Sequence, residues 1–271
     1  MTKQAKTKML HEDVPEGAVA TTSDQAKALA LSDADAHAMY GDLRTTDYTI
    51  PRLVVLEGLS PEVTKEKAGH PGDLYVKSLK QNLGAEPFEF VILRRLGRSN
   101  LLWRPLKEGG GILCRADDGR TGVGTPGGDC AKCPKSLWTM SDKGERVAPE
   151  CDENQNFVVV PRAMLTEPEA AFPYALSGAK ARLHEFKNLN LMLTQLMGRR
   201  LPLYAKSLVA TVKPKDSKTV SGAVYHVFTF TWGNDNALLP EAEIQAAASI
   251  AARFATAKVE EPLTDAPETT V

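Results

Sequence analysis

The sequence predicts an α+β protein that is mainly β, and three observations lead to this class. β-branched and aromatic residues gather in short runs bounded by Gly and Pro, which is typical of strands. Two longer segments, 177–197 and 241–258, carry apolar residues at helical spacing. All four cysteines lie between two of the predicted strands, in a stretch whose Gly and Pro content excludes a long regular element.

Composition divides the 271 residues into three parts. Residues 1–40 are polar and Ala-rich without a sustained apolar period, so we expect a flexible N-terminal segment. Residues 41–258 form the predicted folded domain, and residues 259–271 an acidic, disordered C-terminal tail. No apolar run approaches the length of a membrane span, and the N-terminus lacks the apolar core of a signal peptide, so we expect a cytoplasmic protein.

The strand pattern is clearest at residues 88–96, which run from Phe88 to Leu96 between Pro87 and Gly97. Residues 97–100 read as a turn that joins this strand to the next one. A strand at 156–162 leaves the cysteine-containing stretch. The predicted strands are 74–78, 88–96, 101–105, 156–162, 203–212 and 223–232.

The clearest helix is expected at residues 177–197, with Ser177 as its N-cap and Gly198 at its end. Leu183, Phe186, Leu189, Leu193 and Leu196 or Met197 recur at three- and four-residue spacing there, a stripe that indicates core packing. A second helix is predicted at residues 241–258, with Ile244, Ala251 and Phe254 on one stripe.

The cysteines follow the spacing C-x15-C-x2-C-x17-C, as Cys114, Cys130, Cys133 and Cys151. A C-x2-C on a tight turn supplies two corners of a tetrahedral zinc site, and the two lone cysteines supply the others. Four cysteines make a closed site, so the zinc is expected to be structural. The predicted zinc-binding loop is the insertion at residues 110–152.

Other interpretations of the cysteines remain open. Two disulfides, a redox C-x-x-C or unrelated cysteines are alternatives, although a cytosolic chain keeps its thiols reduced. His70, in a Gly/Pro turn, is an alternative ligand that would replace one cysteine.

Charge is distributed unevenly although the net charge is only −1. Residues 77–104 carry six Lys and Arg against two Glu, and residues 180–220 carry nine against two acidic residues. Basic side chains interleaved with aromatic rings are typical of single-stranded nucleic-acid sites, and Trp103 and Trp232 are the better stacking candidates. An OB-fold barrel presents such a surface on one face and its loops. The predicted DNA-binding residues are Lys77, Lys80, Arg94, Arg95, Arg98, Trp103, Arg104, Lys206, Lys213, Lys215, Lys218, Tyr225 and Trp232.

Residues 88–160 and the acidic tail carry a resemblance. The strands, the zinc loop with Cys130-Ala-Lys-Cys133 and the upstream Cys114 resemble the phage T4-type single-stranded DNA-binding proteins. That family uses three cysteines and one histidine, whereas this chain offers Cys151 as the fourth ligand. The resemblance implies a zinc-containing OB-fold, single-stranded DNA as ligand, and an acidic tail that docks replication or recombination proteins. Residues 50–73, together with Cys130, Cys133 and Cys151, also resemble phage replication-associated proteins.

No enzyme motif is present: the chain lacks a P-loop, a GxSxG elbow and an HExxH sequence. We therefore expect a non-enzymatic single-stranded DNA-binding protein of a bacteriophage, acting in replication or recombination in the cytoplasm of the host. A zinc-containing protein-interaction module, such as a transcription or polymerase accessory factor, is the main alternative. A nuclease with an unrecognised site is a further one.

Overall fold

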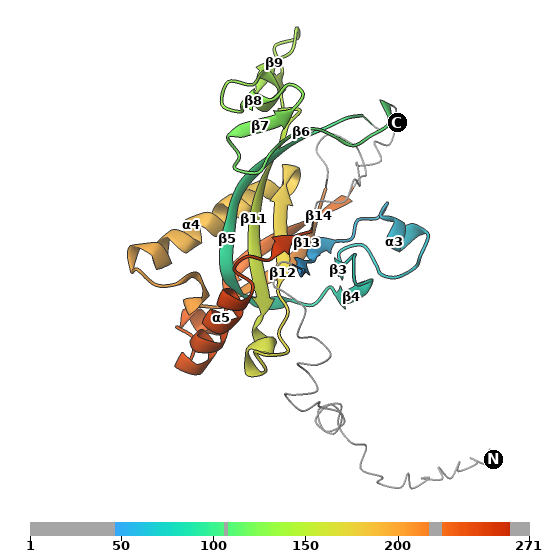
Figure 1. The fold of residues 1–271 in the computed structure, drawn as a ribbon. Helices are drawn as coiled ribbons and strands as arrows, with labels where there is room; N and C mark the ends of the chain where they lie inside the picture. The colour runs from blue at the N-terminus through green and yellow to red at the C-terminus, as the bar shows by residue number, and fades with distance from the viewer. Residues whose placement is uncertain (1–46, 106–107, 217–223, 261–271) are drawn as a thin grey trace, which may run out of the picture. The chain divides into compact units, whose positions relative to one another are not determined.

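The fold is built around one large mixed sheet with a helix on each face (Figure 1). The structure is a computed structural model that describes residues 47–105, 108–216 and 224–260, all within one unit, residues 45–271. The helices are α3 (Pro61–Thr64), α4 (Leu183–Gly198) and α5 (Glu241–Arg253). The strands are β1 (Thr49–Ile50), β2 (Arg52–Val55), β3 (Leu74–Val76), β4 (Gln81–Gly84), β5 (Phe88–Trp103), β6 (Ile112–Ala116), β7 (Thr121–Gly124), β8 (Gly128–Asp129), β9 (Thr139–Met140), β10 (Arg146–Val147), β11 (Asp152–Pro161), β12 (Tyr174–Ala179), β13 (Leu208–Asp216), β14 (Val224–Trp232) and β15 (Lys258–Val259).

Strands β5 and β11 form the centre of the sheet, and residues 90–93 and 157–160 of these strands are buried on both faces. Along β5, Phe90 and Ile92 face the first core cluster, whereas Val91 and Leu93 face the second. Side chains alternate between the two faces of a strand, so a continuous run of apolar residues indicates a strand that is covered on both sides. Residues 90–93 are such a run.

Helix α4 covers the first face and α5 the second. Of the predicted α4 stripe, Phe186, Leu189, Leu193 and Leu196 are buried, whereas Leu183 at the start of the helix is half-buried and Met197 is exposed. Gly178 of β12 lets this helix approach closely, because a Cβ atom there would lie 2.1 Å from the Phe186 ring. On the other face, α5 buries Ala247 and Ile250, and Phe254 follows at its end.

The sheet branches at β5 (Figure 1). Its strand order is β4-β3-β2-β12-β11-β5, with β2 and β12 parallel and the other pairs of this path antiparallel. One edge of β5 pairs with β11 along nearly its whole length. The other edge pairs with β13 at Phe88–Phe90 and with β6 at Asn100–Trp103. The strands β6, β7 and β8 therefore leave the sheet at the opposite end of β5 from the β13–β14 hairpin.

The predicted OB-type barrel is not found, because the described strands do not close into a ring. Instead, β14 reaches the segment after β2 through side chains. The His226 backbone N–H donates to the Glu57 carboxylate at 3.2 Å, and the His226 ring Nδ1 lies 2.9 Å from the same carboxylate. Arg182 contacts Glu57 and donates from Nε to the His226 carbonyl at 2.9 Å. The class is mixed α/β, mainly β, with a curled open sheet.

Several element boundaries differ from the prediction. Residues 97–100, predicted as a turn, continue β5: two register shifts against β11 place extra residues in the strand, and Gly97 adopts φ +88° within it. Ser177, the predicted N-cap, belongs to β12, and α4 begins at Leu183. The second predicted helix ends at Arg253. The predicted N-terminal segment at 1–40 and nearly all of the tail lie outside the described residues. No helix in the described ranges is long and apolar enough to span a membrane.

Candidate metal centre and basic surfaces

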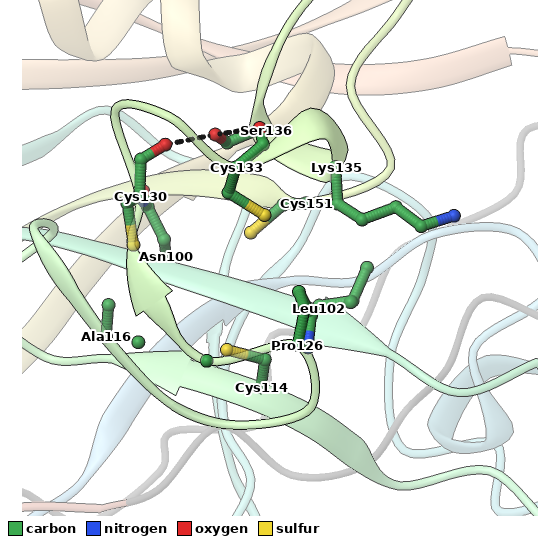
Figure 2. Close-up of a pocket in the computed structure, with 12 residues that line it drawn as sticks. Asn100, Leu102, Cys114, Ala116, Pro126, Cys130, Cys133, Lys135, Ser136 and Cys151 are labelled. Carbon is green, nitrogen blue, oxygen red and sulfur yellow. Dashed lines mark hydrogen bonds between the residues drawn. The ribbon is translucent and has the colours of Figure 1, made fainter.

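The four cysteines line one small cavity (Figure 2). Cys114 belongs to β6, Cys130 and Cys133 follow β8, and Cys151 directly precedes β11. All four lie in the described part of the chain and are free thiols. The cavity volume is about 10 Å³, which corresponds to roughly one water-sized particle. The space between the thiols therefore suits a single ion and excludes an organic ligand.

Backbone hydrogen bonds fix the segments that carry these cysteines. Cys114 is paired with Leu102 of β5 on one side and with Gly124 of β7 on the other. The Cys130 N–H donates to the Arg120 carbonyl at 2.8 Å, and the Cys151 N–H donates to the Lys135 carbonyl at 2.8 Å. The sheet thus brings together cysteines that are up to 37 positions apart in the sequence.

The C-x2-C segment forms the tight turn that the sequence predicted. The Cys133 N–H donates to the Cys130 carbonyl at 3.4 Å, and the Ala131 N–H donates to Asp129 Oδ1 at 2.9 Å. The Ser136 hydroxyl contacts the Cys130 carbonyl and lies 2.9 Å from the Cys133 carbonyl. These contacts hold both thiols of the turn on the cavity side (Figure 2).

The four thiols lie close enough together to influence the pKa of Cys151. Burial, followed by the neighbouring sulfurs of Cys130, Cys114 and Cys133, raises the pKa of the Cys151 thiol to about 11. A bound divalent cation has the opposite effect, because it stabilises the thiolate form of its ligands.

Two observations limit the metal interpretation. Among the described residues, no group of three or more His, Cys, Asp or Glu side chains has the arrangement of a metal site. His70, the alternative ligand, does not line the cavity of the four cysteines; it is exposed and lies 3.8 Å from Asp73. Zinc binding stays a prediction.

The segment between β5 and β11, which we call the cysteine module (residues 104–151), has almost no hydrophobic core. Ala116 is the only buried apolar residue in its described part, 104–105 and 108–151. Five of its larger apolar side chains are instead exposed by 43–76%. They are Val123, Leu137, Trp138, Met140 and Val147.

Several predicted DNA-binding side chains have partners inside the protein. Arg94 donates to the carbonyls of Ala255 and, at 2.9 Å, Ala257, and burial lowers the pKa of its guanidinium. The buried Lys206 donates from Nζ to the Asn236 carbonyl at 2.6 Å and lies over the half-buried Trp232 ring, 5.2 Å from its centroid. These groups stabilise the fold.

Other predicted residues are more accessible. Arg95, Arg98 and Arg104 of the β5 region are exposed, and so is Lys80 in the turn before β4. Lys77 forms an ion pair with Glu62 at 3.3 Å, and Trp103 is half-buried. Lys218 lies outside the described residues.

The β13–β14 hairpin brings three predicted residues to one face. Lys215 is directly opposite Tyr225, and directly paired residues of antiparallel strands point to the same side. Lys213, two positions earlier, shares this face. Both lysines are exposed and the tyrosine is half-buried. The opposite face carries Phe228, which packs into the core beneath α4.

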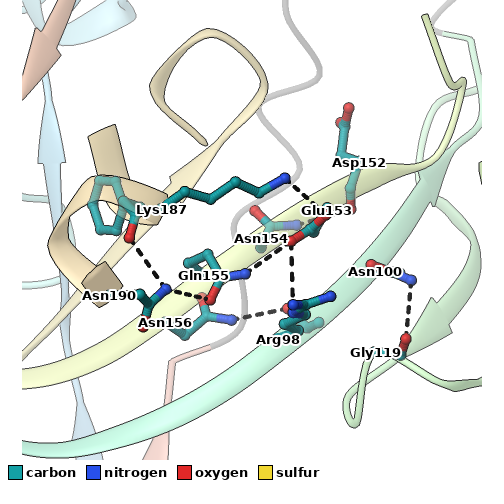
Figure 3. A network of polar contacts seen from close by, with 12 residues as sticks. Arg98, Asn100, Gly119, Asp152, Glu153, Asn154, Gln155, Asn156, Lys187 and Asn190 are labelled. Carbon is teal, nitrogen blue, oxygen red and sulfur yellow. Dashed lines mark hydrogen bonds and ion pairs between the residues drawn. The ribbon is translucent and has the colours of Figure 1, made fainter. Parts of the chain in front are cut away.

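The sequence interpretation missed Glu153 and Lys187. The structure places them beside Arg98, on the α4 side of the sheet (Figure 3). Lys187 lies on the polar side of the predicted helix, but nothing in a local pattern indicates which strand faces it.

The sequence was also compared with known proteins. Residues 19–259 match the family model described as Pam3 phage gp34-like protein. The chain belongs to this family. No curated protein and no solved structure matches it. The predicted phage association is confirmed at this level, whereas the T4-type resemblance and DNA binding stay predictions.

Proposed function

We propose that this phage protein binds single-stranded DNA without catalysing a reaction, during replication or recombination in the host cytoplasm. The observation that carries the proposal is the outer face of the β13–β14 hairpin, where Lys213 and Lys215 lie beside Tyr225. Cations that follow the phosphates, together with a ring that stacks on bases, are the pairing that single-strand binding requires.

The geometry of the hairpin supports this role. Only Leu208–Ala210 of β13 pair with β5, so the lysine-bearing end extends past the central sheet. His226 of β14 contacts Glu57, which follows β2, so the two sides of the sheet approach each other there. An OB-fold is likewise a partly open barrel. Exposed Arg95 and Arg98 of β5 supply further positive charge on the α4 side of the sheet, and exposed Arg104 directly follows β5.

Zinc is proposed as a structural cofactor held by Cys114, Cys130, Cys133 and Cys151. Two features support it: the shared cavity and the near absence of a core in the described part of the cysteine module. A small segment with little buried apolar surface usually needs a metal or disulfides to be stable. The zinc would fix the module against β5 and β11. We also propose that the acidic tail, residues 259–271, contacts replication or recombination proteins.

Fluorescence anisotropy with a labelled dT oligomer and a matched duplex, at low and high salt, tests the proposal. The double variant Lys213→Glu/Lys215→Glu should weaken oligomer binding and reduce the salt slope by about 1.4, since each single-strand phosphate contact contributes about 0.7. The control Lys65→Glu/Lys258→Glu changes net charge equally, at exposed positions outside the hairpin. Absence of oligomer binding at low salt would remove DNA binding as the function.

The exposed apolar side chains of the cysteine module favour a second candidate, a protein-docking module. Trp138 is 55% exposed, and the Arg146 guanidinium carbon lies 4.4 Å from its ring centroid. Exposed apolar groups gathered on one element often mark protein contacts. A photo-crosslinking residue at position 138 in infected cells should then capture one defined polypeptide. The same crosslinking residue at position 197, an exposed site on α4, is the control. If both positions capture the same polypeptide equally well, the module is not a docking site.

A further inference from the structure

Glu153 lies between two cations that come from different elements (Figure 3). Arg98 Nε of β5 is 3.8 Å from one carboxylate oxygen, and Lys187 Nζ of α4 is 3.4 Å from the other. The cation side chains are 63% and 53% exposed, whereas that of Glu153 is 28% exposed. The carboxylate is therefore held close to the protein while both cations remain open to solvent.

A buried amide holds this carboxylate in place. Gln155 is 1% exposed, and its Nε2 donates to Glu153 Oε1 at 2.8 Å. Its own Oε1 accepts from Asn190 at 3.1 Å and from Arg95 at 3.3 Å. Both ends of the amide are satisfied, so the position of Glu153 is fixed by the fold.

The charge balance of this cluster is positive. Arg98 and Lys187 share a single carboxylate, and Arg95 donates to the neighbouring Gln155 amide. The adjacent Asp152 is paired with Lys180 at 3.2 Å, so it does not balance these cations. The separations to Glu153 exceed those of charge-assisted hydrogen bonds, which are about 2.7–2.9 Å. The two cations are thus only loosely held by Glu153.

Arg162 shows the opposite arrangement in the same protein. One guanidinium there lies between two carboxylates, 3.0 Å from Glu89 and 2.8 Å from Glu243. All its partners are close, as expected for a contact that stabilises the fold. The cluster at Glu153 has more cations than carboxylates, longer cation–carboxylate distances and solvent-exposed cations. These features suit the binding of an external anion.

We propose that Arg98 and Lys187, with Arg95, form a binding site for a backbone phosphate of nucleic acid, and that Glu153 takes the place of the phosphate in the free protein. Binding would exchange the Glu153 carboxylate for the phosphodiester as the partner of both cations. The inference rests on the proposed DNA-binding function and adds to it a second contact site, on the α4 side of the sheet, that includes Lys187 and Glu153.

Two variants of the full-length protein test the site. Glu153→Gln keeps a hydrogen-bond acceptor for Gln155 and removes the competing charge, so it should bind a labelled dT oligomer about two- to five-fold more tightly, as expected for an exposed charge interaction. Lys187→Gln should weaken binding by a similar factor and lower the salt slope by about 0.7. Glu169→Gln and Lys258→Gln are matched controls at exposed positions, and thermal denaturation checks that each variant is folded.

The outcomes separate the inference from the function. Tighter binding by Glu153→Gln than by Glu169→Gln, with weaker binding by Lys187→Gln, supports the site. If the wild-type protein binds the oligomer and Glu153→Gln matches Glu169→Gln, the phosphate site is wrong and the function stands. Equal strengthening on a matched duplex would keep the site and overturn the preference for single strands. No binding by any form overturns both.

Discussion

The sheet body and the cysteine module are built on the same two strands but are held together differently. In the body, α4 and α5 bury apolar side chains against both faces of β5 and β11. In the described part of the module, 104–105 and 108–151, one apolar residue is buried and larger ones face solvent. Burial of apolar area stabilises the first region, whereas the second depends on backbone pairing and, as we propose, on a metal ion.

The module is attached to the body through a strand that both regions share. Strand β5 pairs with β11 through the core and continues into the module, where it pairs with β6. Cys114 and Cys151 lie on or beside these strands, so a metal bound by them is tied to the rigid sheet. The body should therefore fold without the module being ordered, but not the reverse.

The largest effect is expected from a core substitution in the body. Phe186 is fully buried and its ring centroid lies 5.2 Å from that of Phe230 and 5.9 Å from that of Phe228. Phe186→Ala should lower the free energy of unfolding by about 3–5 kcal/mol, measured by urea denaturation. Met197→Ala on the same helix, at a 68% exposed position, should change it by less than about 0.5 kcal/mol. Similar losses in both would show that α4 is not the core helix.

The next effect should be confined to the module. Cys130→Ser/Cys133→Ser removes two proposed ligands, so bound zinc should fall from one ion per chain to near zero. Hydrogen exchange should become faster across residues 112–151, while the amides of Val158 and Val159 in β11 stay protected. The free energy of unfolding of the body should change by less than about 1 kcal/mol.

A wild-type protein purified without metal would contradict the zinc proposal. A chelator that leaves exchange in residues 112–151 unchanged would do the same. Loss of protection throughout β11 in the cysteine variant would instead show that the body and the module unfold together. The body would then not fold independently of the module.

A smaller effect separates structural from functional cations. The hydrogen bond to Glu243, and then that to Glu89, raises the pKa of Arg162, so the folded state favours its charged form. Arg162→Met leaves two carboxylates without their partner and should cost about 1–3 kcal/mol of unfolding free energy. Arg98→Met should cost less than about 0.5 kcal/mol, because that side chain is 63% exposed. Equal costs would remove the distinction between the two clusters.

The sequence predicted what depends on local periodicity. The α4 stripe and residues 88–96 of β5 are as expected, because apolar spacing reflects which faces are buried. The grouping of the four cysteines also follows from their spacing and from the C-x2-C turn. The continuation of β5 through Gly97 was not predictable, because pairing with β11 overrides the turn tendency of that residue.

The basic site was less predictable for a physical reason. Register shifts near Leu93 and Leu96 change the alternation of β5, so Arg94 faces α5 whereas Arg95 and Arg98 lie on the α4 side. Simple alternation would place Arg94 and Arg98 on one face. The contacts of Glu153 depend on the packing of α4 against β11, which no local pattern encodes.

The smallest effect on stability is expected at the surface of the module. Trp138 is 55% exposed, whereas Trp103 and Trp232 are half-buried, so Trp138→Ala should remove most of the acrylamide-accessible fluorescence. The free energy of unfolding should change by less than about 0.5 kcal/mol, because little apolar area is lost from the core. Zinc content should stay at that of the wild type. Loss of zinc from this variant, or faster hydrogen exchange in residues 112–151, would mean that the apolar residues form a core for the module. The module would then be stabilised by apolar burial, as the body is, and not by a metal alone.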